Sequence, residues 1–174
     1  MDLREAQKPL KERYRAEPSE ARITLTAKGG ETSGAAACSV DIGRAVYEAQ
    51  AHAGVGGPGT GACSGDLLLG ALAACAQITC QMVAAAMGIA ARSIHARVEG
   101  ELDLSGTLGI SRDVPVGFQK IGIRFEVDAP EATPAELRAL AEKTEQYCVV
   151  MQTLAHPPRL GVEWGRPASE PSSP

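Results

Sequence analysis

The chain has 174 residues, of which 44% are apolar but only 3% aromatic, so its core must consist mainly of alanine, valine, leucine and isoleucine. This length suits one domain. The 17 lysines and arginines against 21 aspartates and glutamates give a net charge of −4, which excludes a basic nucleic-acid-binding protein.

The two ends of the chain differ in composition from its middle. Residues 1–21 are polar and show only a weak helical spacing, which predicts a loosely docked N-terminal arm. Because this segment has no apolar stretch of the signal-peptide type, we expect a cytoplasmic, reducing environment. Residues 165–174 contain three prolines and three serines, which is the composition of a disordered, solvated tail. The folded domain is therefore expected at residues 22–164.

Three strands are predicted in the first part of the domain. Residues 22–28 alternate apolar and polar side chains and run into the Gly29-Gly30 pair, which indicates a strand followed by a turn. A second strand is expected at residues 35–42 and a short third one at residues 44–47. Residues 51–61 contain five glycines and a proline, so we expect a loop there.

Residues 67–87 form a run of 21 residues without a charged side chain. This is long enough to span a bilayer. Its many alanines, its two glutamines and the lack of a basic cluster on either side argue against a membrane segment. We therefore expect a helix buried on nearly all sides within a domain or a dimer. Ser64 and Asp66 supply its start signal and Gly88 its stop.

Alternation resumes after this helix. Residues 93–103 and residues 121–128 each alternate apolar and charged side chains, which predicts two strands paired as a hairpin. Thr133 and Glu136 then form a capping box with a proline at the first helical position. A helix is expected at residues 134–146.

The end of the domain is less regular. After a break near Cys148, one or two further helical turns are expected up to Ala155. Beyond the Pro157-Pro158 pair, a final strand should contain Leu160, Val162 and Trp164. The order of strands, long helix, strands, helix and strand predicts an α+β domain.

Five cysteines stand at irregular spacing, which fits a secreted disulfide scaffold poorly. In a reducing compartment, an oxidised pair is more often catalytic or redox-sensing than structural. Cys75 lies in the long helix among small side chains that leave space above its sulfur, although an inert buried thiol is its default interpretation. Cys148 precedes a possible helix, whose first amides would favour its thiolate.

The remaining cysteines and the histidines suggest less chemistry. Cys75 and Cys80 are separated by about 140° around a helix and cannot readily bridge each other. We expect Cys80, like Cys38 and Cys63, to be structural. The chain has no C-x-x-C pair and its three histidines stand alone, so neither a metal site nor a cofactor is expected. Thiol redox chemistry is the class that remains.

Two segments carry a resemblance to a known family. The residues from Ser64 to Cys75, SGDLLLGALAAC, resemble the central-helix motif of the OsmC/Ohr family of osmotically inducible and organic hydroperoxide resistance proteins. The residues YCVV at 147–150 resemble the second-cysteine motif of that family. The order of elements also agrees, so the resemblance covers about residues 22–164. It implies antiparallel sheets around a long buried central helix, in an intertwined homodimer with two sites at the subunit interface.

The resemblance also implies an activity. It predicts a peroxiredoxin-like hydroperoxide reductase, an antioxidant enzyme that acts on organic hydroperoxides. Cys75 would be the peroxidatic residue, whose thiolate attacks the peroxide and becomes a sulfenic acid. Cys148 would be the resolving residue that forms a disulfide with Cys75, and a dithiol reductant would restore both thiols.

The chain departs from the family pattern at two positions. Gly65 stands where the family commonly has a glutamate that holds a thiolate-activating arginine, and Asp66 could substitute for it with a shorter reach. Val149 stands where the family usually has proline. Arg44 is our first candidate for the activating arginine and Arg22 the second. These departures motivate an alternative function, a non-catalytic protein of this fold that binds an apolar ligand at the dimer interface.

Overall fold

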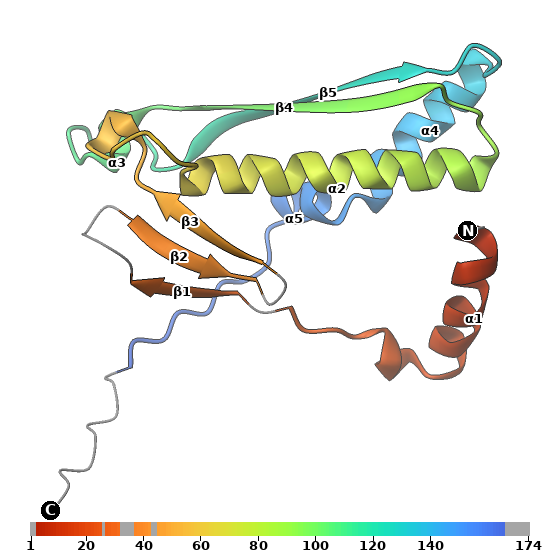
Figure 1. Cartoon of the computed structure of the whole chain (residues 1–174), viewed down its shortest axis with the longest axis horizontal. Coiled ribbons are helices and arrows are strands. Elements are labelled where there is room, and N and C mark those ends of the chain that lie inside the picture. The colour runs from red at the N-terminus through yellow and green to blue at the C-terminus, as the bar shows by residue number, and fades with distance from the viewer. Residues whose placement is uncertain (1–2, 26, 32–36, 43–44, 166–174) are drawn as a thin grey trace, which may run out of the picture.

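The computed structural model describes residues 3–25, 27–31, 37–42 and 45–165. A long helix, α2, runs beneath a ribbon of two long strands, β4 and β5, and the short helices α4 and α5 pack on another side of it (Figure 1). A separate sheet of three short strands, β1 to β3, lies near the N-terminal end of α2 (Figure 1). The α+β class predicted from the sequence is confirmed.

The N-terminal segment, expected as a loosely docked arm with weak helical spacing, is helical. Helix α1 spans Leu3–Ala16 and is followed by a single 3-10 turn at Pro18–Ala21. An exposed ion pair joins Arg13 Nε to Glu20 Oε2 at 2.9 Å across the bend between them. The helix is rich in charged side chains and contains Pro9, and only Leu3, Leu10 and Tyr14 mark its apolar face, so the sequence indicates it weakly.

The first sheet is antiparallel, with strand order β1-β2-β3. Strand β1 spans Lys28–Glu31, β2 spans Ala37–Asp41 and β3 spans Val46–Gln50. The second and third strands agree with the sequence prediction to within a few residues.

The prediction for the first strand was wrong. The described residues among 22–27 are outside any strand and exposed, and β1 instead contains the Gly29-Gly30 pair that was expected to turn. Alternation in the sequence reflects a surface that is half covered, and the described part of this chain provides no partner for Ile23 and Leu25.

The Gln50 side chain bonds to the far end of the glycine-rich loop that leads to α2. Gln50 Oε1 accepts hydrogen bonds from Thr60 Oγ1 and from the Gly61 N–H, both at 3.0 Å. A 3-10 turn at Ala53–Val55 ends at Gly56, whose φ of 87° is in the left-handed region. The predicted loop is therefore confirmed.

Helix α2 spans Ser64–Met87, so it begins at the predicted start signal. Its N-cap residue is Cys63 rather than Ser64, and the Cys63 N–H donates to Asp66 Oδ2 at 2.9 Å. Gly88, with a φ of 74°, ends the helix as predicted.

Helix α2 is buried along one stripe only. Leu72, Ala76, Cys80 and Ala84 recur at intervals of four residues and are buried. Ile78, 55% exposed, shows that the opposite face is open in a single chain. The expectation of burial on nearly all sides is therefore not met within one subunit. By length and hydropathy the helix would also pass as a membrane span, a criterion that core helices of soluble proteins meet too.

Strands β4, Ser93–Leu102, and β5, Phe118–Asp128, form the predicted antiparallel pair, with Val98 opposite Ile123. The connection between them contains the short helix α3, Leu104–Thr107, so it is longer than a tight hairpin. Apolar side chains on one face of this ribbon pack against α2, and charged side chains occupy the other face.

The C-terminal helices meet at one residue. Helix α4 spans Pro134–Tyr147 and has the predicted capping box, in which Thr133 Oγ1 accepts the Glu136 N–H at 3.2 Å. Helix α5 spans Val149–Ala155, as expected for the further helical turns. The predicted last strand is absent from the described residues 156–165, and Trp164 is 96% exposed. This segment pairs with none of the strands in the described part of the chain.

A single side chain ties α2 to the edge of β4. Gln77 Nε2 donates to the Ile94 carbonyl at 2.7 Å, and Gln77 Oε1 accepts the Ala96 N–H at 2.8 Å. The Gln77 side-chain amide thus takes the place of a neighbouring strand at this part of the β4 edge. Backbone groups left unpaired there would lower the stability of the fold.

We expect Gln77→Leu to lower the free energy of unfolding by about 1–3 kcal/mol, because it leaves a half-buried N–H and C=O of β4 without partners. Urea denaturation measures the change. Gln81→Leu is the matched control, since Gln81 lies one turn further along α2 and is exposed. An equal loss of stability in both variants would contradict this role for Gln77.

Candidate functional site

The structure brings Cys75 and Cys148 together. Cys75 projects from the middle of α2 and is half-buried, whereas Cys148 is fully buried, with 0% exposure. Leu72, Ala76 and Cys148 form a core cluster, and Cys75 packs against it. Both thiols are free rather than joined in a disulfide.

Cys148 occupies the junction between α4 and α5. Its N–H donates to the Thr144 carbonyl at 3.0 Å and ends α4, while its carbonyl accepts the Gln152 N–H at 2.9 Å and starts α5. Its extended backbone, with φ −73° and ψ 104°, makes the bend between the two helices. The first N–H groups of α5, at Val149 and Val150, have no acceptor within the helix and are available to the neighbouring sulfur.

The surroundings of Cys75 favour its thiolate. Burial alone would raise the pKa of Cys75, but hydrogen bonding from the Val150 N–H, the Cys148 thiol, the Thr79 hydroxyl and the Val149 N–H outweighs burial and lowers this pKa below its ordinary value. The Cys75 Sγ lies 4.0 Å from Thr79 Oγ1. The result is a thiol poised for nucleophilic attack.

Cys148 is shifted in the opposite direction. Burial raises the pKa of Cys148, the Met151 N–H works against this increase, and the adjacent Cys75 raises the pKa further. Cys75 therefore loses its proton first, and Cys148 remains a thiol beside the Cys75 thiolate. Two neighbouring cysteines in this way acquire different chemical characters.

The other cysteines lie apart from this pair. Cys80 is buried next to Ala84 and Leu140, and burial raises its pKa while the Thr144 hydroxyl partly offsets the increase. Cys63 is half-buried at the start of α2, and Cys38 lies in β2. No group of three or more histidine, cysteine, aspartate or glutamate side chains that could hold a metal ion occurs among the residues that the structure describes.

Asp66 and Arg22 are not among the described groups that surround Cys75. The Asp66 carboxylate caps its own helix, and the backbone N–H and thiol of Cys63 lower the pKa of Asp66. Asp66 precedes Cys75 by nine residues, which is about 13 Å along the helix. Arg22 is exposed, and Arg44 lies outside the described residues. None of the described groups that shift the pKa of Cys75 is an arginine.

Sequence reasoning missed three contributors to the site. Thr79 lies four residues after Cys75, and this helical spacing could have identified it as a neighbour. The sequence does not indicate that the Val149 and Val150 amides lie at Cys75, because only the tertiary packing of α5 against α2 places them there.

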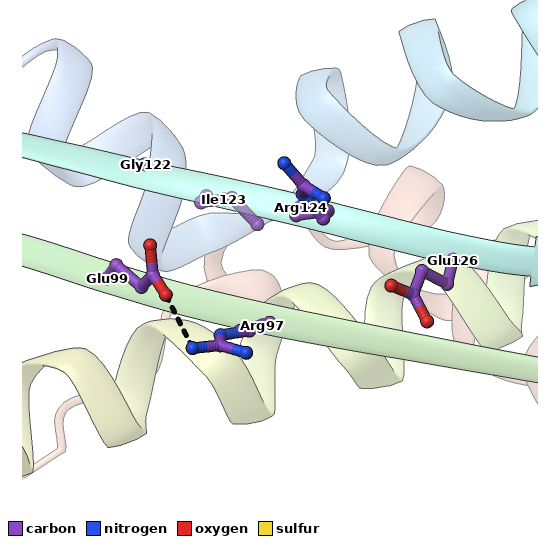
Figure 2. Close-up of a pocket in the computed structure, with 6 residues that line it drawn as sticks. All are labelled: Arg97, Glu99, Gly122, Ile123, Arg124 and Glu126. Carbon is purple, nitrogen blue, oxygen red and sulfur yellow. Dashed lines mark ion pairs between the residues drawn. The ribbon is translucent and has the colours of Figure 1, made fainter.

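Two pockets flank the β4-β5 ribbon. One, of about 510 Å³, lies beside the thiol pair, with Leu72 and Met151 common to its wall and to the thiol cluster. The other, of about 410 Å³, is on the charged face, where Figure 2 shows Arg97 joined to Glu99 by an ion pair of 2.7 Å. Because successive side chains of a strand point to opposite faces, this charged pocket is on the far side of the ribbon from Cys75.

The chain is similar to OsmC-like proteins. The family model described as OsmC-like protein matches residues 57–163. Similar solved structures include an OsmC-like protein from Mycoplasma pneumoniae (20% identity, TM-score 0.60, covering 78% of this chain and 89% of that chain). An OsmC-like protein of unknown function from Vibrio cholerae is 13% identical, with a TM-score of 0.63 and coverage of 76% and 94%.

An organic hydroperoxide resistance protein OsmC from Legionella pneumophila is also similar, at 18% identity and a TM-score of 0.56, with coverage of 77% of this chain and 90% of that chain. No curated protein matches the chain. At these identities the solved structures indicate a shared fold.

We expect Cys75 to be alkylated by iodoacetamide at a lower pH than an ordinary cysteine, because a lowered pKa increases the thiolate fraction at any given pH. Cys148 and Cys80, with raised pKa values, should react only at higher pH. Peptide mapping over a pH series measures the three rates. Thr79→Val should move the Cys75 profile to higher pH, whereas Thr153→Val, on the exposed side of α5, should leave it unchanged. Equal pH profiles for Cys75 and Cys148 would refute the assignment.

Proposed function

The chain belongs to the OsmC-like protein family, and from this premise we propose that it is a thiol-dependent peroxidase that reduces organic hydroperoxides. The observation that carries the proposal is the paired environment of Cys75 and Cys148, in which one pKa is lowered and the other raised. The similar Legionella protein is named an organic hydroperoxide resistance protein, which supports the choice of substrate class.

In the first step, the Cys75 thiolate attacks the terminal oxygen of the hydroperoxide. The S–O bond forms as the O–O bond breaks, the alkoxide takes up a proton and leaves as an alcohol, and Cys75 becomes a sulfenic acid. Val150, Val149 and Thr79 stabilise the thiolate before the attack. The apolar pocket beside the pair suits the organic part of the substrate.

In the second step, the Cys148 sulfur attacks the sulfenic sulfur of Cys75. A disulfide forms, and the sulfenic oxygen leaves as water with the Cys148 proton. A dithiol reductant then reduces the disulfide by two exchanges and is itself oxidised to a disulfide. We place this cycle in the cytoplasm, where such reductants keep thiols reduced.

The residue that follows Cys148 bears on how the thiolate is stabilised. Resemblance to the family leads us to expect proline at this position, and proline has no N–H. Val149 retains that donor, and its N–H lowers the pKa of Cys75. This extra hydrogen bond offsets, in our proposal, part of what Gly65 removes by replacing the family glutamate.

The proposed working unit is a homodimer. One subunit leaves Ile78, Met82 and Leu68 of α2 exposed, together with Val46 and Tyr47 of β3. Large apolar side chains exposed together on one face of a helix mark an interaction site. A second copy would cover the open face of α2.

We expect light scattering coupled to gel filtration to give the mass of a dimer, and Ile78→Glu to weaken the dimer at least about tenfold by placing a charge in the covered face. Ile110→Glu is the control, because Ile110 is 75% exposed and lies outside α2. A monomeric wild-type protein at micromolar concentration would contradict the assembly.

One alternative function has support from a specific observation. The pocket of about 510 Å³ is lined largely by apolar side chains, among them Leu72 and Met151 of the thiol cluster, which suits a non-catalytic protein that binds an apolar ligand. Such a binder should neither consume hydroperoxide nor form a specific, reversible bond between the two thiols.

We expect one equivalent of cumene hydroperoxide to convert the reduced protein to a form with a Cys75–Cys148 disulfide, identified by non-reducing peptide mapping. Cys75→Ser should lower hydroperoxide consumption by about three orders of magnitude, because it removes the nucleophile. Cys148→Ser should complete only the first turnover and accumulate a sulfenic acid that dimedone traps.

Cys80→Ser is the control for loss of an arbitrary thiol, and it should retain the disulfide and the turnover. Rapid turnover by Cys75→Ser would rule out the peroxidase proposal. Ligand retention without hydroperoxide consumption would favour the binding alternative.

A further inference from the structure

A pocket of about 710 Å³ lies at the N-terminal end of α2. The loop after β3, the first turns of α2, α3 and the adjoining ends of β4 and β5 form its walls, and these segments gather at one end of the molecule (Figure 1). Cys63 lines it and precedes Cys75 by 12 residues, which is about 18 Å along a helix. The pocket is therefore distant from the thiol pair, and it shares Leu68 and Phe118 with the wall of the pocket of about 510 Å³.

The walls of this pocket, which we call the α2-start pocket, are largely apolar. Leu69, Val116 and Phe118 are among the side chains that line it. The Phe118 ring is seated against Gly100, where a Cβ would come within 2.5 Å of the ring. Glycine at position 100 thus allows the Phe118 ring to lie directly against β4. A concave apolar pocket of this size, with few polar groups, is typical of sites for small organic ligands.

The polar side chains that line the pocket include His52 and Asp66, and His52 lies near enough to Asp66 to contribute to lowering the pKa of that carboxyl group. His52 Nδ1 accepts the Gly54 N–H at 3.0 Å, so the neutral ring carries its proton on Nε2 and can donate. Asp66 is ionised at neutral pH, because hydrogen bonds from Cys63 lower its pKa. Its carboxylate retains acceptor capacity beyond the bond to the Cys63 N–H.

We propose that the α2-start pocket binds a neutral apolar molecule that carries a hydroxyl group, as an aliphatic alcohol does. The hydroxyl donates to the Asp66 carboxylate and accepts from His52 Nε2–H, while the apolar part contacts Leu69, Val116 and Phe118. The charge of Asp66 disfavours a carboxylate ligand at the same position. This site does not depend on the proposed peroxidase activity.

Cys63 provides the reporter for the test, because it is free, half-buried and part of the pocket wall. The full-length reduced protein is labelled with limiting N-ethylmaleimide, with or without 1-octanol, and the rates at Cys63 and Cys75 are read from the same digest. We expect octanol to slow labelling of Cys63 saturably, by about fivefold or more, and to leave Cys75 unchanged. Octanoate at the same concentration should protect Cys63 far less.

Val116→Trp and Ile110→Trp form a matched pair, since both residues belong to the connection between α3 and β5 and are 74% and 75% exposed. Val116 lines the pocket and Ile110 does not. Filling the pocket with Val116→Trp should abolish protection by octanol, and Ile110→Trp should preserve it. Protection of Cys75 instead of Cys63, equal protection by octanoate, or full protection in Val116→Trp would each overturn the proposal.

Discussion

The close packing of α2 against α4 is the contact on which the rest of the structure depends. One side contributes Leu72, Ala76, Cys80 and Ala84, and the other contributes Leu140, Thr144 and Cys148, each set at intervals of four residues. Small side chains on α2 let the helices approach closely, which buries Cys148 completely and delivers the start of α5 to Cys75. The asymmetry between the two thiols follows from this helix contact.

Much of the fold could be predicted because its elements carry local signals. The capping box at Thr133 and the alternation of residues 93–103 are specified by neighbouring residues alone, and both elements formed where expected. The same alternation misled at residues 22–28 and at Leu160 to Trp164, because a strand needs a partner that its own sequence does not identify. The N-terminal helix was only weakly indicated for a different reason, since it has few apolar residues and contains Pro9.

The candidate site also combines residues that the sequence indicated with groups that it did not. Cys75 and Cys148 could be selected as a pair because each lies in a recognisable segment, and the structure places them in one cluster. The donors that favour the Cys75 thiolate belong mainly to the backbone of a distant helix, and residue identity shows only that such a donor exists, not where it points. Arg44 stays a prediction, as it lies outside the described residues.

The identity of these donors has a consequence for how the site tolerates sequence change. An amide at position 149 or 150 is supplied by every residue except proline, so substitutions there preserve the donor as long as α5 keeps its place. A thiolate stabilised by a charged side chain would lose that stabilisation when the side chain is substituted, and salt would weaken the interaction. Short-range hydrogen bonds from fixed backbone amides are screened far less by salt. Glycine at position 65 therefore leaves the backbone donors at Cys75 in place.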